Sequence, residues 1–216
     1  MTLYRRRERF GGVSVKIGII FSKAGISPNQ WTIISLLPAF IALYYLVQEN
    51  FLAAAFFFLV SAFLDMVDGA VARVMGRVSN LGAYLDTVVD RYVEFLIILG
   101  LLFANLPPAY IYVTSGYPIP IAPLILLYLF GGMATTYVKA AAKEKGLIEG
   151  SELKGGLLER AERLIILFIG ILLASVSPPA LSFIILILAI LTNISALQRI
   201  WIAVRLGRGK YEYSNK

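Results

Sequence analysis

The sequence predicts an all-α, polytopic membrane protein with six transmembrane helices. Of its 216 residues, 59% are hydrophobic and 15% are charged, whereas soluble domains average roughly 45–50% apolar and about 25% charged residues. A helix that crosses a bilayer needs about 20 mostly apolar residues, and six such stretches occupy most of the chain. They are residues 30–47, 51–76, 82–105, 119–143, 157–176 and 179–206. Because no room is left for a separate soluble domain, we expect residues 1–216 to form one membrane domain.

The positions of the basic residues predict the orientation of these spans. The chain has 20 Lys and Arg against 13 Asp and Glu residues, a formal net charge of +7, and the connections at 48–50, 105–118 and 175–179 contain no basic residue. By the positive-inside rule, both termini lie in the cytoplasm. This segregation argues against nucleic-acid binding and favours attraction to anionic lipids and substrates. We therefore expect a multi-pass protein of the plasma membrane whose site faces the cytoplasm.

Two shorter segments complete the predicted fold. Residues 10–24 are apolar but contain two lysines, so they are too short and too charged to span and predict an N-terminal interfacial helix. A break follows, and Pro28 or Asn29 is expected to start the first span. Residues 105–120 contain four prolines, which predict a rigid external connection.

Four aspartates lie at the end of the second predicted span and the start of the third. Asp65 and Asp68 are three residues apart, and Asp86 and Asp90 are four apart, so each pair projects from one face of its helix. If the turn at residues 76–80 makes the two helices antiparallel neighbours, the two faces can meet. The sequence therefore places four carboxylates close together within a membrane protein.

Such a cluster needs a compensating charge. An ionised carboxylate costs roughly 2.5–3.5 kcal/mol at the bilayer centre, and Arg73 and Arg91 supply only two cations nearby. The chain has no histidine and no cysteine, which leaves oxygen ligands and favours Mg²⁺ or Mn²⁺ over zinc. A divalent metal site is therefore the prediction.

Two alternatives accompany this interpretation. The aspartates could pair with arginines to hold helices together, or they could line the path of a cation carrier. Gly69 and Gly82 argue against the carrier, because residues without a side chain let a phosphorylated ligand approach the backbone. Arg73 argues in the same direction, since a guanidinium binds phosphate but serves no purpose in a cation path.

The stretch from Asp65 to Asp90 resembles a known family in every fixed position. It matches D-x2-D-G-x2-A-R-x8-G-x3-D-x3-D, the signature of the CDP-alcohol phosphotransferases, and the six predicted spans are similar to the layout of that family. The resemblance implies a membrane phospholipid synthase. Such an enzyme transfers a lipid phosphate group from a CDP-linked lipid to the hydroxyl of a small acceptor, releases CMP and forms a homodimer.

The resemblance also implies roles for individual residues. The ligands of two metal ions, Mg²⁺ or Mn²⁺, would be Asp65, Asp68, Asp86 and Asp90. Asp90 would also be the catalytic general base. Gly69, Arg73 and Ser79 would contact the CDP group, and Gly82 would let it approach the backbone.

The start of the first span is a further candidate for CDP-lipid binding. It reads Asn29, Gln30, Trp31 and Thr32, where backbone N–H groups and the helix dipole favour a phosphate, and in the family this region approaches the CDP-lipid. The alternative is that Asn29 only caps the helix.

The acceptor is predicted from cations in the last three spans. Arg160 and Arg163 are three residues apart, with Arg199 and Lys139 at similar depth, and guanidinium groups bind phosphate in a fixed fork. The segment from Glu159 to Arg163 resembles the phosphatidylinositol phosphate and archaetidylinositol phosphate synthases. By that resemblance Lys139, Arg160 and Arg199 would hold inositol phosphate.

Three points stay open at this stage. Glycerol 3-phosphate could use the same cations. These side chains could instead be anchors that reach to lipid headgroups. The lipid could have a diacylglycerol or an archaeal ether core.

Overall fold

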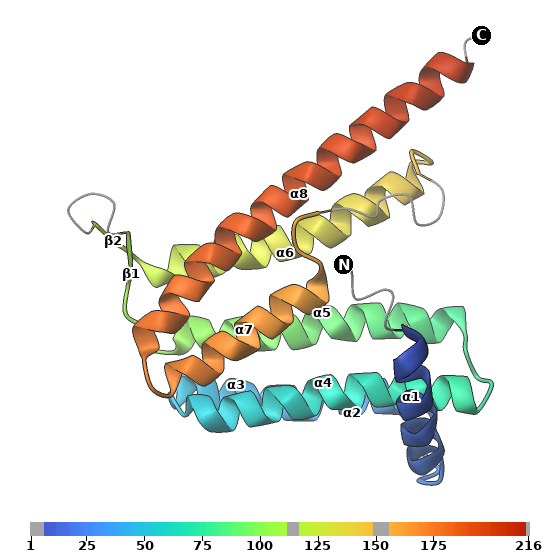
Figure 1. The fold of residues 1–216 in the computed structure, drawn as a ribbon, viewed down its shortest axis with the longest axis horizontal. Coiled ribbons are helices and arrows are strands. Elements are labelled where there is room, and N and C mark those ends of the chain that lie inside the picture. The colour runs from blue at the N-terminus through green and yellow to red at the C-terminus, as the bar shows by residue number, and fades with distance from the viewer. Residues whose placement is uncertain (1–6, 112–116, 149–155, 215–216) are drawn as a thin grey trace. The chain divides into compact units, whose positions relative to one another are not determined.

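The computed structural model describes residues 7–111, 117–148 and 156–214, and these residues are mostly helical (Figure 1). In this part of the chain the elements are α1 (Arg7–Ser22), α2 (Pro28–Ile34), α3 (Leu36–Val47), α4 (Phe51–Val74), α5 (Asn80–Phe103), β1 (Ala109–Ile111), β2 (Tyr117–Ile119), α6 (Ile121–Glu144), α7 (Arg160–Ala174) and α8 (Pro178–Ser214). The chain divides into two compact units, Met1–Phe103 and Ala104–Lys216.

In the first unit, the first predicted span is a broken helix made of α2 and α3. The break falls at Ser35, because Pro38 has no N–H for the carbonyl of Ile34, and a proline ring clashes with the carbonyl four residues before it. At this break, the carbonyl of Ser35 accepts a hydrogen bond from the hydroxyl of Ser61 on α4 at 2.8 Å. The break is thus stabilised by the neighbouring helix.

The turn between α4 and α5 is built from two helix caps. Gly76 has a φ of 62°, which a glycine adopts without steric cost. Its N–H donates to the carbonyl of Arg73, and the N–H of Arg77 donates to the carbonyl of Ala72 at 2.9 Å, the Schellman pattern that ends many helices. The hydroxyl of Ser79 then accepts from the N–H of Gly82 at 3.0 Å and caps the start of α5.

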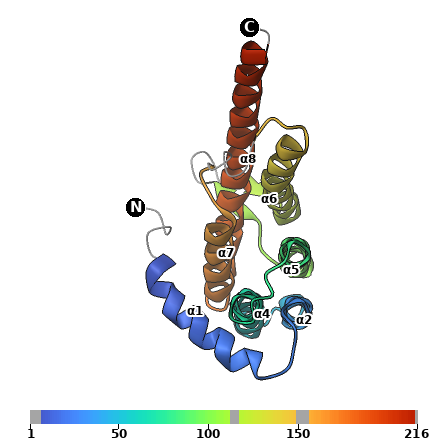
Figure 2. The same cartoon turned by 90° about the vertical axis from the view of Figure 1, so that its right-hand side faces the viewer.

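Helix α1 runs across α4 rather than along it (Figures 1 and 2). The two helices meet at Gly18, where an added Cβ would lie 2.6 Å from the carbonyl oxygen of Ala70. Beside this crossing, Trp31 packs with Val67 and Val71 in a small apolar core. The predicted N-terminal helix is therefore present, and a glycine lets it approach the helix that bears the first aspartates.

In the second unit, α6 and α7 both pack against α8. The α6–α8 crossing is close at Gly131, where an added Cβ would lie 2.5 Å from Oγ1 of Thr192. Asn193 of α8 donates to the carbonyl of Leu127 at 2.9 Å. These contacts fix α6 and α8 against each other and position the polar residues further along them.

The predicted connection at 105–120 contains a short antiparallel ribbon rather than only irregular chain. Strand β1 pairs with β2, with Ala109 opposite Ile119 and Tyr110 opposite Pro118. Aromatic and β-branched residues favour strands, and the prediction weighed only the prolines. The mostly helical structure remains consistent with the predicted all-α class, to which this hairpin adds two short strands.

Among the described residues, four helical stretches are long and apolar enough to cross a membrane. They are Pro28–Val47, Phe51–Val74, Ile121–Glu144 and Pro178–Gly207. Helix α5 carries several charged residues, and α7 has 15 residues, fewer than the roughly 20 that a span needs. The protein is thus mostly helical with four candidate spans, and the count of six stays a prediction.

Candidate active site

Three of the four predicted aspartates meet between α4 and α5. One carboxylate oxygen from each of Asp65, Asp68 and Asp86 lies within 4.8 Å of the other two. Asp90, one turn after Asp86 on α5, lies beside Asp65. The two faces that the sequence spacing defined therefore face each other in the structure.

The donor set fits a hard divalent cation. Asp68 is only 6% exposed, and its Oδ2 has no hydrogen-bond partner among the described residues. Leaving a buried acceptor unsatisfied costs about 1–3 kcal/mol, more for a charged group. Carboxylate oxygens at this spacing are the ligands that Mg²⁺ and Mn²⁺ prefer, and a bound cation would supply the partner that Oδ2 needs.

The two arginines that could have paired with the aspartates have partners elsewhere. Nη1 of Arg91 forms an ion pair with Oε2 of Glu94 at 2.7 Å. Nη2 of Arg73 donates to the hydroxyl of Ser14 on α1 at 2.8 Å. The contact of Arg73 with Ser14 weakens, for that arginine, the alternative in which arginines hold the aspartates as structural pairs.

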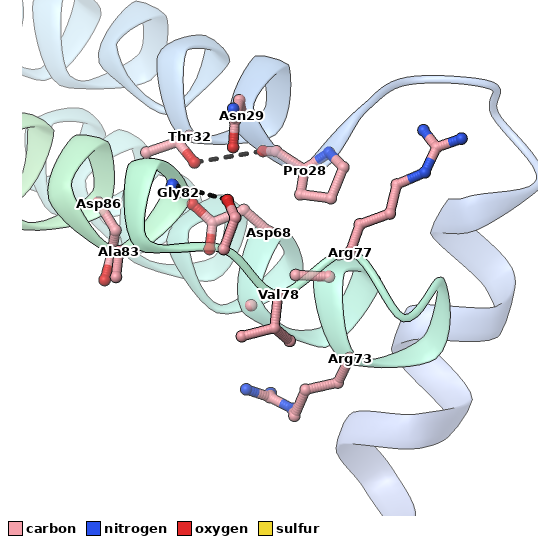
Figure 3. Close-up of a pocket in the computed structure, with 13 residues that line it drawn as sticks. Pro28, Asn29, Thr32, Asp68, Arg73, Arg77, Val78, Gly82, Ala83 and Asp86 are labelled. Carbon is pink, nitrogen blue, oxygen red and sulfur yellow. Dashed lines mark hydrogen bonds between the residues drawn. The ribbon is translucent and has the colours of Figure 1, made fainter.

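A pocket of about 330 Å³ adjoins the aspartate cluster. It lies between the start of α2, the end of α4 and the start of α5 (Figure 3). Its lining consists of Pro28, Asn29, Thr32, Asp68, Gly69, Ala72, Arg73, Arg77, Val78, Ser79, Gly82, Ala83 and Asp86. Asp68 and Asp86 lie toward one end and the two arginines toward the other (Figure 3). One end thus suits a cation and the other an anion.

The two pocket glycines sit where a side chain would crowd polar groups. A Cβ at Gly82 would lie 3.3 Å from Oδ1 of Asn29 and from Oγ of Ser79, and a Cβ at Gly69 would lie 3.3 Å from Nη1 of Arg73. Both glycines therefore keep the backbone of the pocket accessible.

The four predicted residues of the first span divide into two pairs. Asn29 and Thr32 line the pocket. Gln30 does not, because its Oε1 accepts from the backbone N–H of Ser27 at 2.8 Å and closes a capping box. Trp31 is 9% exposed and stacks edge-on against Phe21. The helix cap is thus Ser27, and the alternative that Asn29 caps is wrong.

Arg77 is a charged pocket residue that the sequence analysis did not assign to the site. It lies in the turn between α4 and α5 and lines the pocket with Arg73. Its position in the short connection between the two aspartate-bearing helices could have indicated that it belongs to the site. Its position became evident only once the Schellman turn placed it beside Ser79.

The second unit holds the predicted acceptor cations. Nη1 of Arg199 on α8 donates to the main-chain carbonyl of Thr135 on α6 at 2.9 Å. Arg160 at the start of α7 is half-buried, and Lys139 on α6 is exposed. Arg163 is 1% exposed and is the largest fully buried side chain among the described residues. Arg163 of α7 and Arg199 of α8 therefore both contact Thr135 of α6.

These features define a class of protein: a helical membrane protein with a carboxylate cluster suited to a divalent cation, next to a pocket with basic residues. The CDP-alcohol phosphatidyltransferase family model matches residues 26–204. The chain belongs to this family, and the match extends over both compact units.

The chain is similar to several characterised relatives. It is 32% identical over 186 residues to the archaetidylinositol phosphate synthase of Pyrococcus horikoshii, which covers 86% of this chain and 88% of that protein. The crystal structure of Mycobacterium tuberculosis phosphatidylinositol phosphate synthase with CDP-DAG bound superimposes with a TM-score of 0.75 at 28% identity, covering 89% of this chain and 94% of that one. The same enzyme in complex with manganese and citrate gives a TM-score of 0.74 at 28% identity, covering 88% of each chain.

The comparisons confirm the predicted family and the predicted enzyme class. The protein is a transferase of phospholipid biosynthesis, and the cation-carrier alternative is disfavoured. A divalent metal is consistent with the aspartate cluster and with the manganese complex of the relative.

Proposed function

We propose that the protein transfers the lipid phosphate group of a CDP-linked lipid to a hydroxyl of inositol phosphate and releases CMP. The observation that carries this proposal is the pocket that joins Asp68 and Asp86 to Arg73 and Arg77 in a chain whose relatives are phosphatidylinositol phosphate and archaetidylinositol phosphate synthases.

The pocket is the proposed site of the CDP group. Its volume of about 330 Å³ is within the range of small-ligand sites, about 300–1,000 Å³. Ser79 and Asn29 offer polar contacts beside Gly82, and Arg73 lies above Gly69. The CDP-DAG complex of the mycobacterial relative supports a CDP-linked lipid as the ligand.

The proposed cofactor is a pair of Mg²⁺ or Mn²⁺ ions held by Asp65, Asp68, Asp86 and Asp90. When bound, such ions neutralise a diphosphate and stabilise the charge that develops on the departing CMP. The manganese complex of the relative supports a divalent metal, and the clustering of three of the carboxylates supports these ligands.

Asp90 is the proposed general base. As the acceptor oxygen attacks the phosphorus on the lipid side, its proton passes to the carboxylate of Asp90, a new P–O bond forms, and the P–O bond to CMP breaks. Proton transfer by a positioned carboxylate contributes typically 10²–10⁴-fold in rate. The place of Asp90 beside Asp65 supports this role.

The proposed acceptor site consists of Lys139, Arg160 and Arg199. Arg199 is already oriented by its bond to the carbonyl of Thr135, and Lys139 lies one helical turn after Thr135 on the same face of α6. Glycerol 3-phosphate could use the same cations, but the names of the relatives favour inositol phosphate.

We further propose that the protein is a homodimer of the plasma membrane, that it has six spans, and that its active site faces the cytoplasm. The two spans beyond the four candidates would be α5 and α7. The nine residues Phe95–Phe103 at the end of α5 are all apolar, which supports its insertion. The charge-free connections support the orientation.

The direct test supplies purified protein with CDP-lipid, Mg²⁺ and one of four acceptors: inositol phosphate, glycerol 3-phosphate, serine or free inositol. We expect CMP release and a labelled lipid product with inositol phosphate, and none when the acceptor is omitted. A product with glycerol 3-phosphate alone would replace the proposed acceptor. If CMP were released with serine or free inositol but with neither phosphorylated acceptor, the proposed acceptor site would be wrong.

A further inference from the structure

The buried Arg163 contacts the same residue that orients Arg199. Its Nη1 donates to the hydroxyl oxygen of Thr135 at 3.0 Å, and that hydroxyl donates to the carbonyl of Gly132 at 2.8 Å. The carbonyl of Thr135 accepts from Arg199 at 2.9 Å. Thr135 of α6 thus contacts α7 through its side chain and α8 through its main chain.

The exposure of the two arginines separates their roles. Arg199 is half-buried, so the residue stays partly accessible. Arg163 and Thr135 are each 1% exposed, so neither can meet a ligand without a rearrangement of the three helices. Arg163 and Glu159 are both charged neighbours of Arg199. A second guanidinium behind the first raises the local positive potential.

Arg199 is also confined on its other side. A Cβ at Gly156 would lie 3.3 Å from Nε of Arg199, and Gly156 has a φ of 136°, a backbone conformation that other residues rarely adopt. The next residues are tied to α8, because the N–H of Leu157 donates to Gln198 at 2.9 Å and the N–H of Leu158 donates to Ser195 at 3.1 Å. Arg199 therefore contacts both Gly156, in the chain before α7, and the carbonyl of Thr135 on α6.

We propose that Arg163 is a positioning residue for acceptor binding, which acts through Thr135 to fix Arg199 and to add positive potential behind it. This inference rests on the proposed function, because it assumes that Arg199 meets a phosphorylated acceptor. It assigns to Arg163 a role distinct from ligand contact: the residue sets affinity for the acceptor and leaves CDP-lipid binding and the chemical step unchanged.

The test uses two conservative variants of the full-length enzyme. Arg163→Lys keeps the charge and loses the guanidinium fork, and Thr135→Val keeps the shape and loses the hydroxyl that accepts from Arg163. Each variant weakens a hydrogen bond to a charged group, so we expect each to raise the KM for inositol phosphate by about tenfold or more. The KM for CDP-lipid and the kcat should change by less than about twofold, because neither depends on the contacts among Arg163, Thr135 and Arg199.

Three further variants separate positioning from loss of structure. Thr135→Ser retains the hydroxyl and should keep a KM for inositol phosphate near that of the wild type. The Arg163→Lys, Thr135→Val double variant should be no worse than the more affected single variant, because both changes remove one contact. Leu167→Ala, a fully buried apolar change one turn further along α7, should lower thermal stability without raising the KM for the acceptor.

The outcomes distinguish this inference from the proposed function. If the wild type turns over inositol phosphate and both single variants keep its KM within about twofold of the wild-type value, the positioning role is wrong. It is equally wrong if Leu167→Ala raises that KM as much as Arg163→Lys does, or if both substrates lose affinity together. If the wild type uses only glycerol 3-phosphate, the same KM comparisons are made with that acceptor. A wild type that uses no phosphorylated acceptor overturns both.

Discussion

Replacing Asp68 by Asn should stabilise the metal-free protein while it abolishes activity. In the structure Asp65, Asp68 and Asp86 bring carboxylate oxygens within 4.8 Å of one another. Two unit charges at that distance repel by about 3 kcal/mol at an effective dielectric constant of 20. Removing the charge of Asp68 therefore relieves about 3 kcal/mol for each neighbour that is ionised, less the cost of burying an amide in its place.

The assay is thermal unfolding in detergent, with and without Mn²⁺ or Mg²⁺. Wild-type protein should gain stability from the metal, because a ligand that binds only the folded state stabilises it by mass action. The Asp68→Asn protein should have the higher midpoint without metal and should gain little from metal. Glu144→Gln is the matched control, since Glu144 is an exposed residue paired with Lys145 and such pairs contribute about 0–1 kcal/mol.

Two results would refute this reasoning. The first is an Asp68→Asn protein that is less stable than wild type without metal, which would mean that the carboxylate is needed for folding itself. The second is an undiminished stabilisation by Mn²⁺ and Mg²⁺ in the variant, which would place the metal elsewhere.

Three other perturbations test the site, the packing of α1 and the topology. Asp90→Asn should fold and bind CDP-lipid, yet release CMP about 10²–10⁴-fold more slowly, and a rate near that of wild type would exclude it as the base. Gly18→Ala should lower the unfolding midpoint, since its Cβ would lie 2.6 Å from the α4 backbone and overpacking costs about 1–3 kcal/mol, whereas Gly12→Ala, with nothing within 4 Å, should not. Cysteines introduced at Asn50 and Lys145 should react with an impermeant reagent from opposite sides of the membrane, and labelling from one side would contradict the predicted span order.

Much of the aspartate site was predictable from sequence because its geometry is local. The spacings within Asp65–Asp68 and Asp86–Asp90 follow from helical periodicity, and a short turn forces two helices to be neighbours. The end of α4 at Gly76 and the cap at Ser79 follow from rules that involve only a few adjacent residues.

Features that depend on competing local signals were predicted less well. Both Ser27 and Asn29 are suitable helix caps, and the pairing of Ser27 with Gln30 decided between them. Gln30, which forms that capping box, does not line the pocket. The ribbon β1–β2 was missed because prolines and β-favouring residues occur in the same short segment, and only the pairing with a second strand decides the outcome.

Contacts between helices that lie far apart along the chain were not predictable from the sequence. Arg160 and Arg163 each directly follow a glutamate in the sequence, yet the structure leaves Arg160 half-exposed and buries Arg163. The difference depends on Thr135, which lies 28 residues away along the chain. No periodicity or motif connects those two positions.

The turn between α4 and α5 also fixes the angular register of the metal site. Successive residues of an α-helix are rotated by about 100°. One residue inserted between the Schellman turn at Gly76 and the cap at Ser79 would therefore turn Asp86 away from Asp65, if α5 began one residue earlier and absorbed the insertion. The two caps use the hydrogen-bonding groups at both ends of this short link, which leaves little slack to absorb an extra residue. The number of residues between Arg73 and Gly82, eight, is therefore constrained by geometry. A connection of this length lets the carboxylates of α4 and α5 lie close together.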